Sequence, residues 1–230
     1  DHSESKLLFV GKLDDWSEIQ KGIPKSMPCI SFPLAPPNDY ETWDSIMAKT
    51  EPLQGNPRVR AEDPAIIVYT SGSTGRPKGV MHSFGAIAAS VEGAESIFHA
   101  TPEDRMLSYL PLAHVFERFC VETQGLRAGM QLFFAESLET FVADLNRAQP
   151  TIFVSVPRLW LKFQLGVFRK MPPEKLARLI RIPLLNRVIK KKILTGLGPH
   201  HVRLAASGSA PIPPDLLQWY RDIGLETVEG

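Results

Sequence analysis

Residues 69–79 read YTSGSTGRPKG and begin where a short apolar, strand-like segment, 65–69, ends. Glycines in such a run let successive backbone N–H groups converge on an anion, because no side chain keeps the ligand away from the backbone. The hydroxyls of Ser71, Ser73 and Thr74 add donors, and Lys78 adds a compact positive charge. This run therefore predicts a loop that holds the phosphates of ATP. The alternative, a flexible polar surface turn, is disfavoured by so long and ordered a motif.

The Walker phosphate loop is the obvious competing interpretation. It requires a lysine directly after glycine and directly before Ser or Thr. Here Lys78 follows Pro77 and precedes Gly79, so the kinase and GTPase class built on that loop is disfavoured.

Short apolar segments alternate with helical patterns along the chain. The residues 84, 87, 88, 91 and 98 share one helical face after the phosphate loop, and 138, 141, 142 and 145 share another after a Ser137 cap. Strands that are apolar on both faces suit burial between helices. We therefore predict an α/β fold with largely parallel sheets flanked by helices. The predicted strands are 6–10, 29–32, 65–69, 106–110, 131–135, 151–156, 202–206 and 225–228.

The composition is that of an ordinary globular protein. The chain has 230 residues, 43% hydrophobic and 22% charged, and a net charge of +1 gives no reason to expect a nucleic-acid partner. Cys29 and Cys120 are the two cysteines, with no spacing typical of a zinc site or a disulfide framework, which fits a reducing cytoplasm. No apolar run approaches the length of a membrane span.

Both ends lead us to expect an excerpt of a longer protein. Asp1 stands where an initiator methionine would be, and Gly230 follows directly on a predicted strand. We expect three sub-blocks: a strand-containing block at 1–32, a proline-rich connector at 33–64, and a block at 65–230 that carries the phosphate loop.

The loop 69–79 resembles the signature loop of the adenylate-forming superfamily, which includes acyl-CoA synthetases, luciferases and the adenylation domains of peptide synthetases. The segment 110–118, LPLAHVFER, looks most like the long-chain acyl-CoA synthetase branch. The resemblance implies that His114, in a turn before an amphipathic helix at 115–126, lines the carboxylate end of an acyl pocket. A lone histidine is otherwise more often a structural residue.

A third matching segment is 206–211, ASGSAP, at the end of a predicted strand. Small residues allow the backbone to approach a flat base closely, and the resemblance implies that this segment binds adenine. Taken alone it is a generic strand-to-helix turn. Glu229 and Gly230 match the start of the family's Glu-Gly-Tyr-Gly-x-Thr-Glu motif. The predicted adenine-site residues are Ser207, Gly208, Ser209, Ala210, Pro211, Glu229 and Gly230.

The resemblance implies two half-reactions at one centre. A carboxylate oxygen attacks the α-phosphorus of ATP and expels pyrophosphate, and the thiol of coenzyme A then attacks the acyl-adenylate and releases AMP. Thr74, Lys78 and His114 are the implied catalytic residues. Magnesium would share the phosphate charge, but its protein ligands, like the small C-terminal domain with its lysine, are expected outside this chain. The implied phosphate-binding residues are Thr70, Ser71, Gly72, Ser73, Thr74, Gly75 and Lys78.

Two other functions stay open. An amino-acid-activating adenylation domain would share these motifs, and the segment by itself could be a nucleotide-binding module without turnover. All three predict small-molecule partners.

The segment 169–194 interleaves basic and apolar residues, and Pro183 divides it into two helical pieces. Such a surface can dock on anionic lipid, which would place the protein peripherally at a membrane. The preferred interpretation is a solvated helix face that packs through its leucines.

Overall fold

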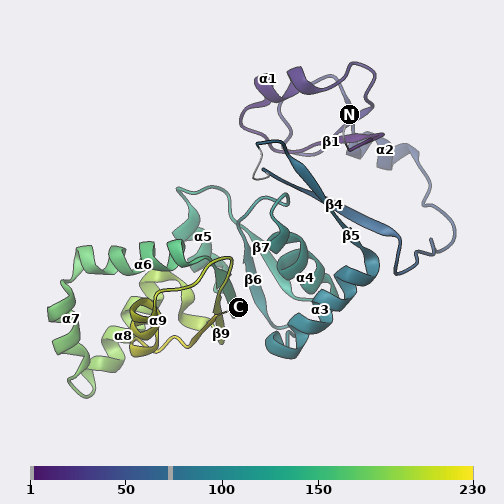
Figure 1. The fold of residues 1–230 in the computed structure, drawn as a ribbon. Coiled ribbons are helices and arrows are strands. Elements are labelled where there is room, and N and C mark those ends of the chain that lie inside the picture. Colours follow the sequence, from purple (N-terminus) through teal and green to yellow (C-terminus); the bar gives the residue numbers. More distant parts are fainter. Residues whose placement is uncertain (1–2, 72–74, 230) are drawn as a thin grey trace. The chain divides into compact units, whose positions relative to one another are not determined.

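The computed structural model describes residues 3–71 and 75–229 and divides into two compact units (Figure 1). One unit comprises Asp1–Arg60 and Ser71–Gly79, and the other comprises Ala61–Thr70 and Val80–Gly230. The sub-blocks predicted at 1–32, 33–64 and 65–230 stay a prediction.

The first unit is built on a small parallel sheet in the order β1-β2-β3. Its apolar contacts come from a stack of Phe9 on Phe32, with ring centroids 5.1 Å apart, and from Trp43, whose ring lies 5.3 Å from Phe32. The elements are β1 (Leu8–Val10), α1 (Trp16–Ile19), η1 (Gln20–Gly22), β2 (Cys29–Ser31), β3 (Glu41–Thr42) and α2 (Trp43–Lys49).

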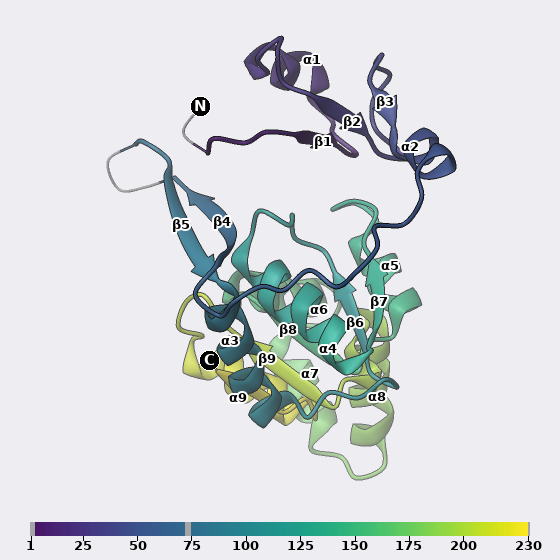
Figure 2. The same ribbon diagram turned by 90° about the vertical axis from the view of Figure 1, so that its right-hand side faces the viewer.

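The second unit alternates strands and helices (Figures 1 and 2). It begins with the two-stranded sheet β4-β5, in which Lys78 and Gly79 of β5 are counted with the first unit. It continues into two parallel sheets, β6-β7 and β8-β9-β10. The elements are β4 (Pro64–Thr70), β5 (Lys78–Ser83), α3 (Phe84–Phe98), β6 (Arg105–Ser108), η2 (Glu117–Thr123), α4 (Gln124–Ala128), β7 (Gln131–Phe134), α5 (Phe141–Ala148), β8 (Ile152–Ser155), α6 (Pro157–Lys170), α7 (Pro173–Ile180), α8 (Leu185–Leu197), η3 (Pro199–His201), β9 (Leu204–Ser207), α9 (Pro214–Asp222) and β10 (Thr227–Glu229).

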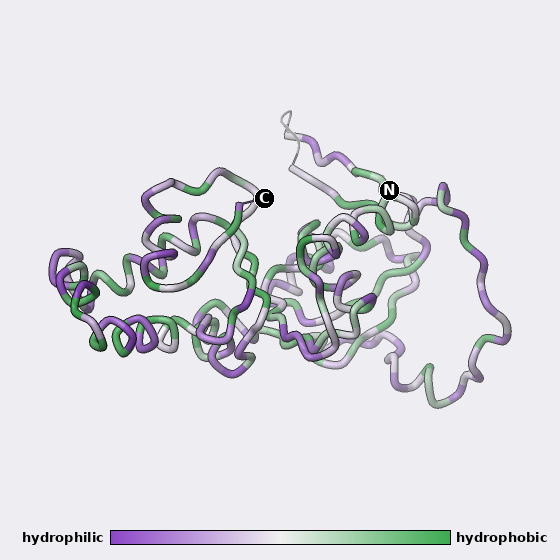
Figure 3. The backbone as a smooth tube through the Cα atoms, turned by 90° about the horizontal axis from the view of Figure 1, so that it is seen from below, coloured by the Kyte–Doolittle hydropathy of each residue, from purple (hydrophilic) through white to green (hydrophobic). Residues whose placement is uncertain are grey.

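The core of the second unit lies on both faces of its parallel strands. Because side chains alternate along a strand, Leu107, Phe153 and Ala205 enter one buried cluster, whereas Met106 and Ile152 enter another. The first cluster is covered by α5, α6 and α9, and the second by α3 and the η2–α4 segment. Along the helices, hydrophobic and hydrophilic residues alternate (Figure 3). The predicted α/β fold with parallel strands between helices is confirmed.

Local sequence explains where several helices begin and end. The Ser83 side chain accepts the Ala86 N–H at 3.2 Å and so caps the start of α3, which ends at His99 in the left-handed conformation, with φ 42°. α6 and α9 each begin with a proline, which loses no helical hydrogen bond at that position. Helix α8 ends at Gly198, where φ is +103° and a Cβ would lie 2.7 Å from Leu145.

Three local predictions need correction. The cap of the helix over 141–148 is Thr140, not Ser137, whose hydroxyl instead accepts the Thr140 N–H. The helix expected at 115–126 is a π-helix, η2, over most of its length. Strands β3 and β5 were not predicted, because their polar residues lack the apolar pattern used to find strands.

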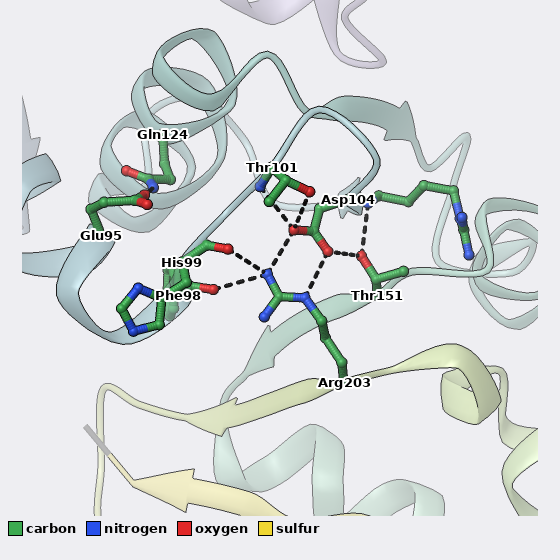
Figure 4. A network of polar contacts seen from close by, with 9 residues as sticks. Glu95, Phe98, His99, Thr101, Asp104, Gln124, Thr151 and Arg203 are labelled. Carbon is green, nitrogen blue, oxygen red and sulfur yellow. Dashed lines mark hydrogen bonds and ion pairs between the residues drawn. The ribbon is translucent and has the colours of Figure 1, made fainter.

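Asp104 joins the starting ends of three strands (Figure 4). Arg203, just before β9, donates to both Asp104 oxygens, at 2.9 Å from Nε and 2.6 Å from Nη2. The Thr151 hydroxyl, just before β8, donates to Asp104 at 2.6 Å and accepts the Arg105 N–H of β6 at 2.9 Å. Arg203 also donates to the Phe98 carbonyl, which ties the end of α3 to the same point. Strands β6, β8 and β9 are thereby held at a common edge.

These donors hold the pKa of the Asp104 carboxyl well below its usual value. The Arg203 hydrogen bond is the largest cause, and it outweighs the burial that opposes ionisation. Because the side chain of Asp104 is only 5% exposed, an uncompensated change here leaves buried donors without a partner.

We predict that Asp104→Asn lowers the free energy of unfolding by about 2–4 kcal/mol, because a buried charge-assisted pair is replaced by a neutral amide. Since the folded pKa is depressed, this contribution is complete above about pH 4 and is lost as pH falls below it. Urea unfolding of the wild type and of Asp104→Asn, from neutral to acid pH, measures this contribution. The difference in unfolding free energy between the two proteins should narrow on acidification. Glu226→Gln, at the exposed pair with Arg221, is the control and should cost below about 1 kcal/mol. A constant gap across this range would contradict the prediction.

Candidate functional site

The predicted phosphate loop connects the paired strands β4 and β5. Thr70 ends β4, and Ser71 follows it and is exposed. Gly75 has φ +75°, the left-handed conformation that favours glycine, so the loop turns there toward β5. Lys78 is exposed and is the first residue of β5, not a residue of the loop proper. The predicted residues Gly72, Ser73 and Thr74 lie outside the described residues.

His114 lies in the turn that precedes η2. Its backbone N–H donates to the Pro111 carbonyl at 2.8 Å, and its ring Nδ1 accepts the backbone N–H of Phe116 at 3.2 Å. Because Nδ1 accepts, the proton is assigned to Nε2, and Nε2–H is the group through which this half-buried ring can meet a ligand.

Glu117, three residues later, holds the whole turn. It is fully buried, and its carboxylate accepts the N–H groups of Tyr109 and Leu110 at 2.9 and 2.7 Å and the Ser108 hydroxyl at 3.0 Å. A carboxylate can only accept hydrogen bonds, and every one of these three groups donates. The turn that carries His114 is therefore fixed at both ends, by the end of β6 and by the start of η2.

Tyr109 links this turn to the neighbouring strand. Its hydroxyl lies 2.9 Å from the Ser155 hydroxyl and 3.3 Å from the Val154 carbonyl, both on β8. Burial raises the pKa of Tyr109 above its ordinary value, so the phenol stays neutral and can donate. Strands β6 and β8 therefore meet at their carboxyl ends through side chains.

The carboxyl ends of β8, β9 and β10 form a row. Ser155 pairs in register with Ser207, and Ser207 with Glu229. The Gly208 N–H donates to the Ser155 carbonyl at 3.0 Å, and the Glu229 carboxylate accepts the Ile212 N–H at 3.1 Å. The segment predicted to bind adenine is thus closed into a loop against Glu229.

Two features of this loop suit a ligand. Ser209 has φ 66°, a strained conformation for a residue with a side chain, and Ser209, Ala210 and Pro211 are exposed. The Ser207 hydroxyl is buried and has no hydrogen-bond partner among residues 3–71 and 75–229. A buried hydroxyl without a partner is uncommon in folded proteins. Gly230 lies outside the described residues.

A cavity of about 250 Å³ lies beside the His114 turn. Its wall combines η2 and Val115, two residues before it, with one face of α3 and the end of β5. The ring of His82 meets that of Phe119 edge-on at 5.1 Å. Burial, with a smaller effect of the Glu117 charge, raises the pKa of the Cys120 thiol to about 11, so this side chain is neutral and behaves as an apolar group. The lining residues are His82, Ser90, Ala94, Val115, Phe119 and Cys120.

Comparisons with known proteins identify the family of this chain. The AMP-binding enzyme family matches residues 1–230, the whole chain. The chain belongs to the AMP-binding enzyme family. The resemblance to the adenylate-forming superfamily, drawn from three short motifs, is thereby confirmed.

Curated relatives of this AMP-binding chain carry long-chain acyl-CoA ligase names. It is 33% identical to Long-chain-fatty-acid--CoA ligase 5 of Rattus norvegicus, over 74% of this chain and 27% of the relative. It is 28% identical to Long chain acyl-CoA synthetase 3 of Arabidopsis thaliana, over 99% of this chain and 40% of the relative. The chain thus spans between about a quarter and two fifths of these relatives' length.

Solved structures of other enzymes share the fold. One is the A-PCP didomain of carboxylic acid reductase from Segniliparus rugosus in complex with AMP, with a TM-score of 0.66 and 26% identity over 83% of this chain and 27% of that chain. Another is the anthranilate CoA ligase AuaEII in complex with anthranoyl-AMP, with a TM-score of 0.70 and 17% identity over 97% of this chain and 40% of that chain.

The structure also bears on metals and membranes. Among the residues that it describes, no three His, Cys, Asp or Glu side chains come close enough to hold a metal ion together. No helix within the same residues has the length and apolar character needed to cross a bilayer.

Sequence reasoning brought Ser207 and Glu229 to the site but missed Glu117 and Ser155. Glu117 was quoted only as part of the motif around His114. A signal was available, because a charged residue amid the apolar residues of an amphipathic segment is buried only when partners satisfy it.

We predict that Glu117→Ala lowers the free energy of unfolding by about 3–5 kcal/mol, because two partly buried backbone N–H groups and a buried hydroxyl lose their acceptor. Glu117→Gln keeps one acceptor oxygen and should cost about 1–2 kcal/mol. Thermal and urea unfolding measure both. Glu122→Ala, which removes a half-exposed partner of Arg118 from the same helix, is the control and should cost below about 1 kcal/mol. Equal costs for Glu117→Ala and Glu122→Ala would contradict the role assigned to Glu117.

Proposed function

We propose that this chain carries the nucleotide and acyl sites of an enzyme that activates a long-chain fatty acid with ATP and transfers it to coenzyme A. The observation that carries the proposal is the match of residues 1–230 to the AMP-binding enzyme family, together with relatives named as long-chain acyl-CoA ligases. The first product would be an acyl-adenylate and pyrophosphate, and the second a thioester and AMP.

In this proposal the phosphates of ATP bind the loop between β4 and β5. The residues are Thr70, Ser71, Gly72, Ser73, Thr74 and Gly75, with Lys78 at the start of β5. Lys78 is exposed, so its charge is accessible to a phosphate. Backbone donors and a fixed positive charge would stabilise the leaving pyrophosphate, which carries the charge that develops as the bond breaks. Magnesium would share this charge, with protein ligands from outside the chain.

Adenine would bind at the carboxyl ends of β9 and β10. The proposed residues are Ser207, Gly208, Ser209, Ala210 and Pro211, with Glu229 and Gly230. The exposed, small residues of the loop leave room for a flat base, and the unpartnered Ser207 hydroxyl is a group that a ligand or its water could satisfy. Glu229 would act by holding the loop through Ile212, as its hydrogen bond indicates.

The carboxylate of the acid would lie near His114, and its hydrocarbon tail would enter the adjoining cavity. Nε2–H of His114 can donate to a carboxylate oxygen, since Nδ1 is occupied by the Phe116 N–H. Ala94, Val115 and Phe119 give the cavity an apolar wall, and neutral Cys120 adds to it. No enzyme nucleophile takes part, so the residues act by positioning and charge stabilisation.

Carboxylate-dependent exchange of pyrophosphate into ATP tests the proposal in the full-length protein. We predict exchange with long-chain fatty acids, and a fall of about 10²–10³-fold in rate for Lys78→Ala, as expected when one transition-state charge contact is removed. Lys25→Ala, an exposed lysine in a turn of the same unit, is the matched control and should leave the rate unchanged. Exchange only with amino acids would move the protein to the adenylation-domain branch, and ATP binding without exchange would overturn the enzymatic proposal.

A second prediction concerns the cavity. Ala94→Trp fills much of its volume, so it should lower kcat/KM for long-chain acids by about tenfold or more while sparing short ones. Ala89→Trp, on an exposed face of the same helix, is the control. Equal losses with long and short acids would place the acyl chain elsewhere.

A further inference from the structure

The helical hairpin formed by α7 and α8 has one anchored side. Leu176 on α7 is 2% exposed. Ile180, Ile193 and Leu197 pack against the buried cluster that contains Trp160. The hairpin is therefore fixed to the second unit by its own apolar face, and its other face is available.

Aliphatic side chains gather at the exposed tip of the hairpin. Leu184 is 80% exposed and Val188 is 62% exposed, and neither belongs to a buried cluster of the described residues. Leu185 and Val188 lie three positions apart in the first turn of α8, so they share one face, and Leu184 directly precedes the helix. With Ile182 they form an aliphatic tip, and none of these four residues belongs to a buried cluster of residues 3–71 and 75–229.

The backbone at the tip is strained. Leu184 has φ 70° and ψ −50°, and the Leu185 N–H donates to the Pro183 carbonyl at 2.8 Å, which closes a γ-turn around Leu184. This turn is rare for a residue with a side chain. Strained residues cluster at binding sites, and here the strain accompanies a leucine that is largely in water.

Positive charge surrounds the tip. Residues 169–194 contain nine Lys and Arg but only one acidic residue, Glu174, whereas the whole chain has a net charge of +1. The exposed basic residues next to the tip are Lys175, Arg178 and Arg181 on the α7 side and Arg187, Lys191 and Lys192 on α8.

We propose that the α7–α8 hairpin docks on the surface of an anionic lipid bilayer. The aliphatic tip would enter the interface between headgroups and acyl chains, and the surrounding Lys and Arg would bind lipid phosphates. A single-stranded nucleic acid is a poorer match, because its bases stack on aromatic side chains and the tip is aliphatic. A second copy of the hairpin would bring like charges together. This inference goes beyond the proposed function, because binding of the hairpin to lipid requires no catalytic turnover.

Co-sedimentation of the full-length protein with vesicles tests the proposal, without ATP or fatty acid. We expect binding to phosphatidylcholine vesicles that contain phosphatidylserine, weaker binding at high salt, and none to pure phosphatidylcholine. Leu184→Asp should lower the partition coefficient about tenfold or more. Leu126→Asp is the matched control, since Leu126 on α4 is 79% exposed, and it should bind like the wild type.

Two double variants, each with two basic residues replaced by glutamate, test the contribution of charge to binding. Arg187→Glu with Lys191→Glu should lower binding at least about 25-fold, since each lost basic residue costs about fivefold. Arg127→Glu with Lys25→Glu makes the same change of charge at residues that do not belong to the hairpin and should bind measurably more tightly than the hairpin reversal. Four outcomes would overturn the proposal: equal binding to neutral and anionic vesicles, equal loss of binding in the two charge reversals, unchanged binding of Leu184→Asp, and competition by oligonucleotides. Circular dichroism verifies that every variant is folded.

Discussion

The hydrogen-bonded ion pair between Asp104 and Arg203 sets the arrangement on which the second unit depends. It fixes the starting ends of β6, β8 and β9 and the end of α3 at one edge of the parallel strands. Because β8 and β9 pair in register from Ile152 and Leu204 to Ser155 and Ser207, their opposite ends are fixed as well. Ser108, Ser155 and Ser207 end these strands, and the candidate site lies there. Binding residues in such sheets are commonly found at strand carboxyl ends, with the stabilising network at the other edge.

A second buried carboxylate, that of Glu117, holds the candidate site in place, as Asp104 holds the strands. Glu117 satisfies two backbone N–H groups and a hydroxyl, so the turn that carries His114 keeps one conformation before any ligand arrives. A rigid turn reduces the entropy that must be lost on binding. The same charge also opposes ionisation of Cys120, which keeps the neighbouring cavity free of a thiolate.

The sequence predicts the strands well and the polar architecture poorly. The strand at 151–156 and the helix over 84–98 stand out because apolar residues with a clear period leave few other arrangements. Thr151 and Arg203 give no periodic signal, since their shared partner Asp104 lies 47 and 99 positions away in the chain. The π-helical segment is equally hidden, because seven residues are too few to distinguish its period from that of an α-helix. The site motifs were found by resemblance, and their physical neighbours, such as Ser155, emerge only from the register of the strands.

The path of the chain between the two units has a practical consequence. The units exchange residues at three junctions: between Arg60 and Ala61, between Thr70 and Ser71, and between Gly79 and Val80. Cleavage of a single peptide bond at any one junction divides the chain into two polypeptides, at least one of which still carries residues of both units. Neither unit corresponds to one continuous stretch of sequence, so a gene fragment that encodes residues from both sides of the phosphate loop is needed to produce either one in full.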